Sequence, residues 1–136
     1  MIVVDSSVWI AHLRRLDIPQ VAALHRFVAR DDDQILVGDL VLLEVLQGAS
    51  DEAHAARIER DLRQFMIVAM LNADLAVQAA RNYRHLRSLR VTIRKTIDVV
   101  IATFCLAGGH TLLHADRDFG LMEVHLGLRT VRVGGA

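Results

Sequence analysis

Five carboxylates of this chain lie in or beside strongly apolar segments, where an ionised group is costly to bury unless a cation is near. They are Asp5, Glu44, Asp98, Asp116 and Asp118. Carboxylates that gather in one place repel one another and take up protons unless a divalent cation lies among them. Oxygen ligands without clustered cysteines favour Mg²⁺, with Mn²⁺ as the alternative, over zinc. A Mg²⁺ ion held by a few carboxylates keeps water ligands and can activate one of them to cleave a phosphodiester.

Asp5 and Glu44 each have a purely structural explanation as well. Asp5 follows the apolar run 2–4 and could cap the next helix, although the two serines that follow it, at 6 and 7, could also serve as the cap. The carboxyl end of a strand is also where ligands bind in open α/β sheets. Glu44 lies in segment 40–47, which is apolar around most of a helix, so it needs either a narrow solvated stripe or a nearby cation.

The other three acids stand near the starts of two expected helices. Asp98 lies in the first turn of an apolar helix over 96–107, where the helix dipole alone favours a negative charge by about 0.3–1 kcal/mol. Asp116 and Asp118 directly follow the segment 111–115, so at least one of them lies just past the carboxyl end of a buried strand. We expect one of this pair to cap the next helix and the other to be free for chemistry.

Short apolar runs alternate with longer helical segments along the whole chain, a pattern typical of an α/β fold. Five runs predict strands buried on both faces, as in a parallel sheet covered by helices: 2–4, 35–37, 65–68, 111–113 and 130–133. Helical periodicity and capping residues predict helices over about 6–14, 19–30, 39–48, 51–64, 72–90, 96–108 and 116–127. We expect a three-layer α/β/α sandwich around a mainly parallel five-stranded sheet, which would bring the acids to one crevice.

Composition limits the class of protein. With 136 residues, 53% of them hydrophobic, and one proline, the chain predicts a single folded domain over residues 1–136 and excludes a disordered or low-complexity protein. Sixteen basic and sixteen acidic residues give a formal net charge of zero, so attraction to nucleic acid must come from local clustering. The single cysteine, Cys105, fits a reducing compartment. No export signal or membrane-spanning run is visible, and we expect a cytoplasmic protein without a membrane partner.

Four blocks of sequence carry a resemblance to a known family. The blocks are IVVDSSVWI at 2–10, LVLLEVLQG at 40–48, the Ile97-Asp98 pair with its apolar helix, and LLHADRDF at 112–119. In their order and spacing they resemble the PIN domain, and within it the VapC-type toxins of bacterial toxin–antitoxin pairs. The resemblance covers nearly the whole chain and implies a PIN-like fold.

The resemblance also implies an activity and a site. It implies a Mg²⁺-dependent endoribonuclease, the toxin of a type II toxin–antitoxin pair, that cleaves structured RNA such as tRNA or rRNA. Similar proteins pair as homodimers and are held inactive by a small antitoxin whose tail covers the site. The chain departs from the family pattern at His114, where relatives often carry Thr or Ser. The implied catalytic and metal-binding acids are Asp5, Glu44, Asp98 and Asp116, with Asp118 as an auxiliary acid and Ser6 as a hydroxyl that orients Asp5 or a metal-bound water.

One segment concentrates positive charge that could hold RNA. Between positions 77 and 97 there are six basic residues and no acid. Arg81, Arg84 and Arg87 would span about a third of a helix circumference, and we expect them to contact phosphates. An ordinary solvated helix face explains the same pattern. Arg117 is a further candidate for phosphate, or else it pairs with one of its two acidic neighbours.

Three functions other than a nuclease are compatible with parts of the pattern, and residues of the chain exclude two of them. A catalytically silent PIN-like protein that only binds RNA or an antitoxin is the main alternative, and the intact acid set favours the enzyme. A phosphatase built on Asp-x-Asp is excluded because Ser7 lies two positions after Asp5. A phosphate-loop NTPase is excluded because the chain has no Gly-x-x-x-x-Gly-Lys run. The high apolar fraction suggests a homodimer or an apolar groove for a partner helix.

Overall fold

The chain alternates strands and helices from end to end. The structure is a computed structural model that describes residues 1–30 and 35–133. Among these residues the elements are β1 (Ile2–Val4), α1 (Ser6–Leu13), α2 (Pro19–Ala29), β2 (Ile35–Gly38), α3 (Asp39–Gln47), α4 (Glu52–Leu62), β3 (Met66–Val68), α5 (Ala73–Ser88), α6 (Thr96–Gly108), β4 (Thr111–Leu113) and α7 (Arg117–Leu126). The helices agree with the predicted ones to within about two residues at most ends.

The four strands form one parallel sheet in the order β3-β2-β1-β4. The predicted fifth strand, 130–133, is wrong, because only Thr130 bridges to Leu112 of β4. Two hydrogen bonds hold this contact, from Leu112 N to Arg129 O and from Val131 N to Leu112 O, both 2.9 Å. Polar residues interrupt the segment, since Thr130 is only half-buried and Arg132 is exposed. It therefore lacks the continuous apolar surface that a strand covered on both faces requires.

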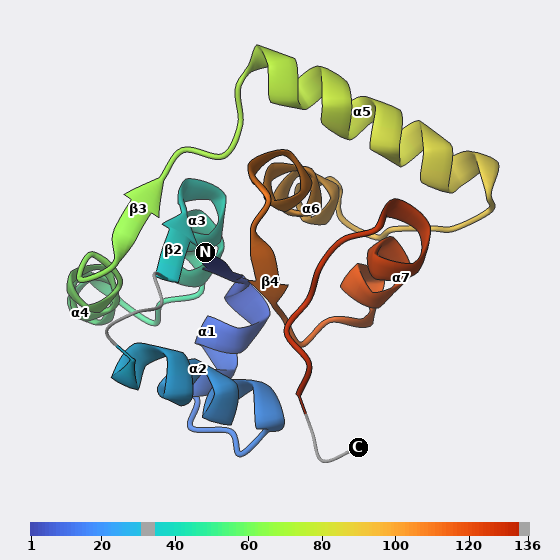
Figure 1. The fold of residues 1–136 in the computed structure, drawn as a ribbon. Coiled ribbons are helices and arrows are strands. Elements are labelled where there is room, and N and C mark those ends of the chain that lie inside the picture. Colours follow the sequence, from blue (N-terminus) through green and yellow to red (C-terminus); the bar gives the residue numbers. More distant parts are fainter. Residues whose placement is uncertain (31–34, 134–136) are drawn as a thin grey trace.

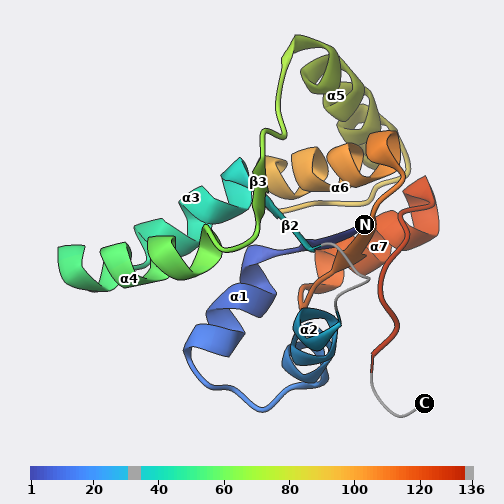
Figure 2. The same cartoon turned by 60° about the vertical axis from the view of Figure 1, so that its left-hand side comes forward.

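Helices cover both faces of the sheet and make three layers. Helix α1 packs against α2 and α3, and α3 packs against α4, whereas α6 packs against both α5 and α7. Figures 1 and 2 show α1 to α4 on one side of the sheet and α5 to α7 on the other. This division follows from right-handed crossovers, because the chain moves one way along the sheet from β1 to β3 and then returns to β4. The predicted α/β/α architecture is confirmed.

The core fills both sides of the central strands. Val3, Val4 and Val37 are fully buried, as are Leu112 and Leu113. Burial on both faces explains why these strands read as continuous apolar runs in the sequence rather than as alternating patterns. In the described part of the chain no helix is both long enough and apolar enough to span a bilayer.

Strand ends lead almost directly into helices at one edge of the sheet. Helix α1 begins two residues after β1 ends, and α3 follows β2 without any intervening residue. Gly38, at that second junction, has no room for a side chain, because a β-carbon there would collide with the sulfur of Met70. The short junctions hold whatever side chains lie at this edge in fixed positions.

Candidate active site

Asp5 lies at the carboxyl end of β1 and caps α1. Its side chain is buried, and its Oδ2 accepts hydrogen bonds from Ser7 N at 3.0 Å and from Ser7 Oγ at 2.6 Å. Its Oδ1 is buried and finds no hydrogen-bond partner among the described residues. Burial raises the pKa of Asp5, and the Ser7 hydrogen bonds oppose that rise. Capping therefore uses one oxygen of Asp5 and leaves the other without a hydrogen-bond partner in the described part of the chain.

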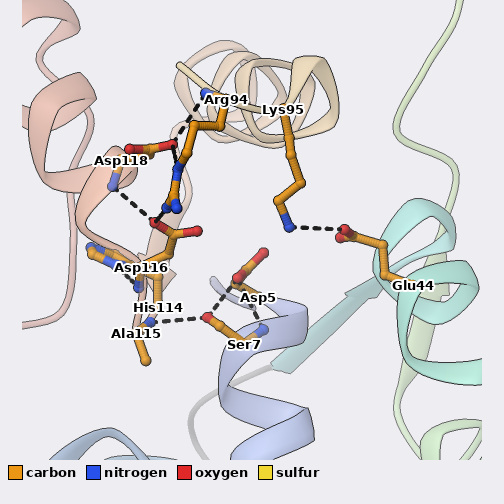
Figure 3. A network of polar contacts seen from close by, with 9 residues as sticks. All are labelled: Asp5, Ser7, Glu44, Arg94, Lys95, His114, Ala115, Asp116 and Asp118. Carbon is orange, nitrogen blue, oxygen red and sulfur yellow. Dashed lines mark hydrogen bonds and ion pairs between the residues drawn. The ribbon is translucent and has the colours of Figure 1, made fainter. Parts of the chain in front are cut away.

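The two serines after Asp5 connect three different elements. Ser7 Oγ, which donates to Asp5, also accepts a hydrogen bond from Ala115 N at 3.0 Å and so ties the end of β1 to the end of β4 (Figure 3). Ser6 Oγ donates instead to Glu44 Oε1 at 3.1 Å. The hydroxyl that orients Asp5 is thus that of Ser7 rather than Ser6. Its position two residues after a capping aspartate is the signal in the sequence.

Glu44 projects from α3 toward the same edge. Its side chain is largely buried, with an exposed fraction of 10%, and its Oε2 lies 3.8 Å from Lys95 Nζ. Burial raises the pKa of Glu44, and the negative charge of Asp5 raises it further, while Ser6 and Lys95 lower it. The hydrogen bond from Ser6 and the nearby ammonium of Lys95 therefore offset part of the cost of burying the Glu44 carboxylate. The sequence predicts such a cation.

Asp98 is buried in the first turn of α6, with an exposed fraction of 2%. Its Oδ2 has no hydrogen-bond partner in the described part of the chain. Burial, reinforced by the charges of Asp5, Asp116 and Glu44, raises the pKa of Asp98 to about 7, although Lys95 opposes this effect. Because the charges of three other carboxylates raise the pKa of Asp98, the four predicted catalytic acids interact electrostatically.

Asp116 and Asp118 complete, from the start of α7, the group of five acids that we call the crevice. Asp116 caps the helix, accepting from Asp118 N at 3.0 Å, and its own N donates to His114 Nδ1 at 3.2 Å. Arg94 lies between the two acids, with Nη2 3.3 Å from Asp116 Oδ1 and Nε 3.2 Å from Asp118 Oδ2 (Figure 3). The cap expected of this pair is therefore Asp116, while Asp118 is paired with a cation rather than free.

The donor set fits a hard divalent cation. Ligand atoms of Asp98, Asp116 and Asp118 lie within 4.8 Å of one another. That group does not include Asp5 or Glu44, although Asp5 Oδ1, like Asp98 Oδ2, is a buried oxygen without a partner among residues 1–30 and 35–133. Carboxylate oxygens are the ligands that Mg²⁺ prefers, and a bound cation would offset the burial and the neighbouring negative charges that raise the pKa of Asp98. We call Asp5 and Asp98 the unpaired acids, and Glu44, Asp116 and Asp118 the ion-paired acids.

The α5 arginines expected to contact RNA line hollows that contain none of the five acids. Arg84 and Arg87 line an apolar groove of about 460 Å³ between α5 and α6, and Arg81 lines a second hollow of about 430 Å³. All three are exposed. Arg117 is exposed too, and within the described ranges it forms no ion pair with either neighbouring acid.

Arg94 and Lys95 are the site residues that the sequence reasoning missed. The Arg94 guanidinium takes the place beside Asp116 and Asp118 that Arg117 was expected to take as an alternative. The available signal is a pair of consecutive cations immediately before the apolar helix that carries Asp98.

Known proteins are similar to this chain in sequence and in fold. VapC ribonuclease Mb1587 of Mycobacterium bovis is 27% identical over 125 residues, which cover 90% of this chain and 91% of that protein. Ribonuclease VapC11 of Mycobacterium tuberculosis matches with the same identity and coverage. Among solved structures, VapBC2 from Rickettsia felis, bound to a promoter DNA fragment, superposes with a TM-score of 0.78 at 15% identity, covering 98% of this chain and 100% of that chain.

A further neighbour is the Mycobacterium tuberculosis toxin VapC20, described as cleaving the Sarcin-Ricin loop. It superposes with a TM-score of 0.71 at 19% identity and covers 97% of this chain and 99% of that one. The PIN domain model matches residues 2–123, a span that includes every acid of the crevice. The chain belongs to the PIN domain family.

Proposed function

We propose that this protein is a metal-dependent endoribonuclease of the VapC type, the toxin of a toxin–antitoxin pair. The observation that carries the proposal is the pair of unpaired acids, whose buried oxygens, Asp5 Oδ1 and Asp98 Oδ2, lack partners in the described part of the molecule. A fold gains no stability from buried carboxylates left in this state. A site that binds a cation and performs chemistry explains why they are there.

The residues divide the work of the proposed site. Asp5, Glu44, Asp98 and Asp116 would hold Mg²⁺ or Mn²⁺, and Asp118 is an auxiliary acid. The ion, when bound, would supply an activated water and stabilise charge that develops on the phosphate. Ser7 and Ser6 would orient two of these ligands, since their hydroxyls already donate to Asp5 and Glu44.

Structured RNA, such as tRNA or rRNA, is the proposed substrate. Arg81, Arg84 and Arg87 on α5 and Arg117 on α7 are exposed cations that would hold phosphates. The description of VapC20 as cleaving an RNA loop supports this choice of substrate.

A small antitoxin and a second copy of the chain are the proposed protein partners, in a cytoplasmic setting. Several of the similar solved structures are VapBC complexes, which supports the antitoxin. Exposed apolar side chains support a homodimer, because Leu71, Val77 and Leu89 on and beside α5 are 49%, 54% and 45% exposed. A separate apolar pocket of about 230 Å³, between α1, α2 and α4, could seat a partner helix.

The decisive experiment compares RNA cleavage by the parent protein and by Asp98→Asn. The parent should cut a structured RNA in Mg²⁺ or Mn²⁺ and should stop when EDTA is added. Asp98→Asn should be inactive, because it removes a charged ligand while preserving the shape of the side chain. Asp74→Asn is the matched control, since Asp74 is an exposed acid in the first turn of α5, and this variant should retain parent activity.

Two results would contradict the proposal. Cleavage by Asp98→Asn at the parent rate would remove this acid from the site. A parent protein that binds RNA but cuts none in any divalent metal would favour the alternative of a catalytically silent binding protein.

A further inference from the structure

The segment that joins α5 to α6, residues 89–95, delivers two cations to the acid crevice. Arg90 adopts a left-handed backbone with φ of 62°, which turns the chain at the end of α5. Ile93 is buried, with an exposed fraction of 5%, and anchors the segment in the core. The next two residues, Arg94 and Lys95, therefore emerge at a fixed place beside the acids.

Both cations reach the acids from the solvent side. The side chains of Arg94 and Lys95 are 60% and 55% exposed, whereas those of their partners Asp116, Asp118 and Glu44 are 17%, 6% and 10% exposed. Figure 3 shows Asp5 between the Arg94 group and the Lys95–Glu44 pair. The two cations thus lie on the solvent side of the acids.

Arg94 and Lys95 are held loosely enough to exchange partners. The Lys95 Nζ to Glu44 Oε2 distance is 3.8 Å, and Arg94 makes two separate contacts of 3.2 and 3.3 Å to different acids. Ion pairs in which one side chain is mostly exposed contribute little, so replacing them costs little. The main chain of Arg94 stays in place through its N–H, which donates to Asp118 Oδ2 at 3.3 Å.

The acids outnumber these cations. Two cations face five carboxylates, and neither cation forms an ion pair with Asp5 or Asp98 in the described ranges. A divalent cation at the unpaired acids would also attract the remaining carboxylates and compete with Arg94 and Lys95 for them. Both side chains would then present free donors at the mouth of the crevice.

We propose that Arg94 and Lys95 are the substrate-phosphate ligands of this site, held by Asp116, Asp118 and Glu44 until a divalent cation takes over these acids. After the exchange, the guanidinium and the ammonium bind anionic oxygens of the RNA backbone next to the cleaved bond. This inference rests on the proposed ribonuclease function, because RNA supplies the phosphates. It predicts opposite effects of one substitution on two ligands, which a purely structural role would not produce.

The test uses Arg94→Gln and Lys95→Gln in the full chain, with Arg63→Gln as the control. Arg63 pairs with Glu59 at 2.7 Å on the exposed face of α4, so this variant loses a comparable ion pair away from the crevice. Calorimetric titration of each metal-free protein with Mn²⁺ measures metal affinity in the absence of RNA. Both site variants should bind Mn²⁺ about threefold to tenfold more tightly than the parent, because a competing cation is gone.

The second arm measures binding of a fluorescently labelled RNA oligonucleotide over a series of salt concentrations. Ca²⁺ replaces Mg²⁺ in this arm because its larger, more flexible coordination shell differs from the Mg²⁺ octahedron, and gel electrophoresis checks that the RNA stays intact. Each site variant should bind RNA several-fold more weakly, and its salt slope should fall by about one. The control should match the parent in both arms.

The outcomes separate this inference from the proposed function. If the parent cleaves RNA while both site variants keep its RNA affinity and salt slope, the inference is overturned and the nuclease proposal stands. Weaker Mn²⁺ binding by both variants would also overturn it. If the parent cleaves no RNA, the proposed function fails, and the phosphate-binding part of the inference fails with it.

Discussion

The two groups of carboxylates in the crevice are balanced in different ways. The ion-paired acids, Glu44, Asp116 and Asp118, each have a cation of the same chain within 4.0 Å. The unpaired acids, Asp5 and Asp98, are as deeply buried, yet each keeps a buried oxygen without a partner among the described residues. Among the described residues, the chain thus neutralises one group itself and leaves each member of the other with an unpartnered oxygen.

The unpaired acids reduce the stability of the folded protein. A buried carboxylate beside other carboxylates destabilises the protein in its charged form, and the pKa of Asp98, raised to about 7, records that cost. Ion pairs elsewhere in the crevice show that the fold is able to place cations near acids. The lack of an ion pair at Asp5 and Asp98 among the described residues supports the proposed role of these acids in binding a cation.

The largest expected effect is the difference in cleavage rate between a variant of an unpaired acid and a variant of an ion-paired acid. Asp5→Asn should lower the rate of metal-dependent RNA cleavage by at least about 100-fold, because losing about 3 kcal/mol of transition-state stabilisation costs roughly two orders of magnitude. Asp118→Asn should lower it by no more than about tenfold, because Asp118 is already paired with Arg94. Single-turnover cleavage at saturating Mg²⁺ measures both rates. Equal losses in the two variants would break the comparison.

The next effect concerns stability without metal. Asp98 has a pKa near 7 when folded and 3.8 as its ordinary value, so the folded state retains a proton that the unfolded state releases between these pH values. The stability of the metal-free protein should therefore fall as pH rises through this window. In EDTA at pH 8, Asp98→Asn should be more stable than the parent by about 1–2 kcal/mol, or roughly 4–8 °C in Tm.

Thermal melts at two pH values check this prediction. At pH 4 the difference between Asp98→Asn and the parent should nearly vanish, because the folded parent then carries a neutral Asp98. Adding Mg²⁺ at pH 8 should raise the Tm of the parent more than that of the variant. A variant less stable than the parent at pH 8 would show that the Asp98 charge is compensated within the chain.

A smaller effect is expected at the serine that positions an unpaired acid. Ser7→Ala removes the 2.6 Å hydrogen bond to Asp5 and the acceptor for Ala115 N. Cleavage should fall about tenfold, and stability should fall by about 1 kcal/mol. Ser50→Ala, an exposed serine far along the chain, serves as the control for losing a hydroxyl. An unchanged cleavage rate would show that Asp5 needs no support from Ser7.

The smallest effect is expected on α5, outside the crevice. Replacing Arg84 and Arg87 together by Ala should weaken RNA binding by only a few-fold and flatten its salt dependence, while cleavage at saturating RNA stays at the parent rate. Fluorescence anisotropy over a salt series measures the slope. A slope identical to that of the parent would assign this helix face to ordinary solvation.

Most of the fold could be predicted from the sequence because its local signals agree with its tertiary structure. Continuous apolar runs such as 2–4 and 111–113 are buried on both faces, and capping residues mark the helix starts. The error at 130–133 arose because a short β-branched run looks alike whether it pairs over several residues or, as here, makes one bridge.

The candidate site could be predicted only in part. The acids were recognisable because ionised side chains stand out in apolar segments, whereas their partners depend on contacts between distant parts of the chain. Ser7 meets Ala115 across 108 positions, and Arg94 meets Asp116 across 22. No local pattern encodes such pairs, so the consecutive cations at Arg94 and Lys95 do not indicate which acids they contact.

The most direct test of this account is the position of a bound ion. Crystals of the protein grown or soaked with Mn²⁺ would give an anomalous-difference map that locates the metal without reference to activity. The account predicts a peak within bonding distance, about 2 Å, of Asp5 and Asp98 carboxylate oxygens. A peak bound only by other residues, or no peak in the crevice at saturating Mn²⁺, would contradict it.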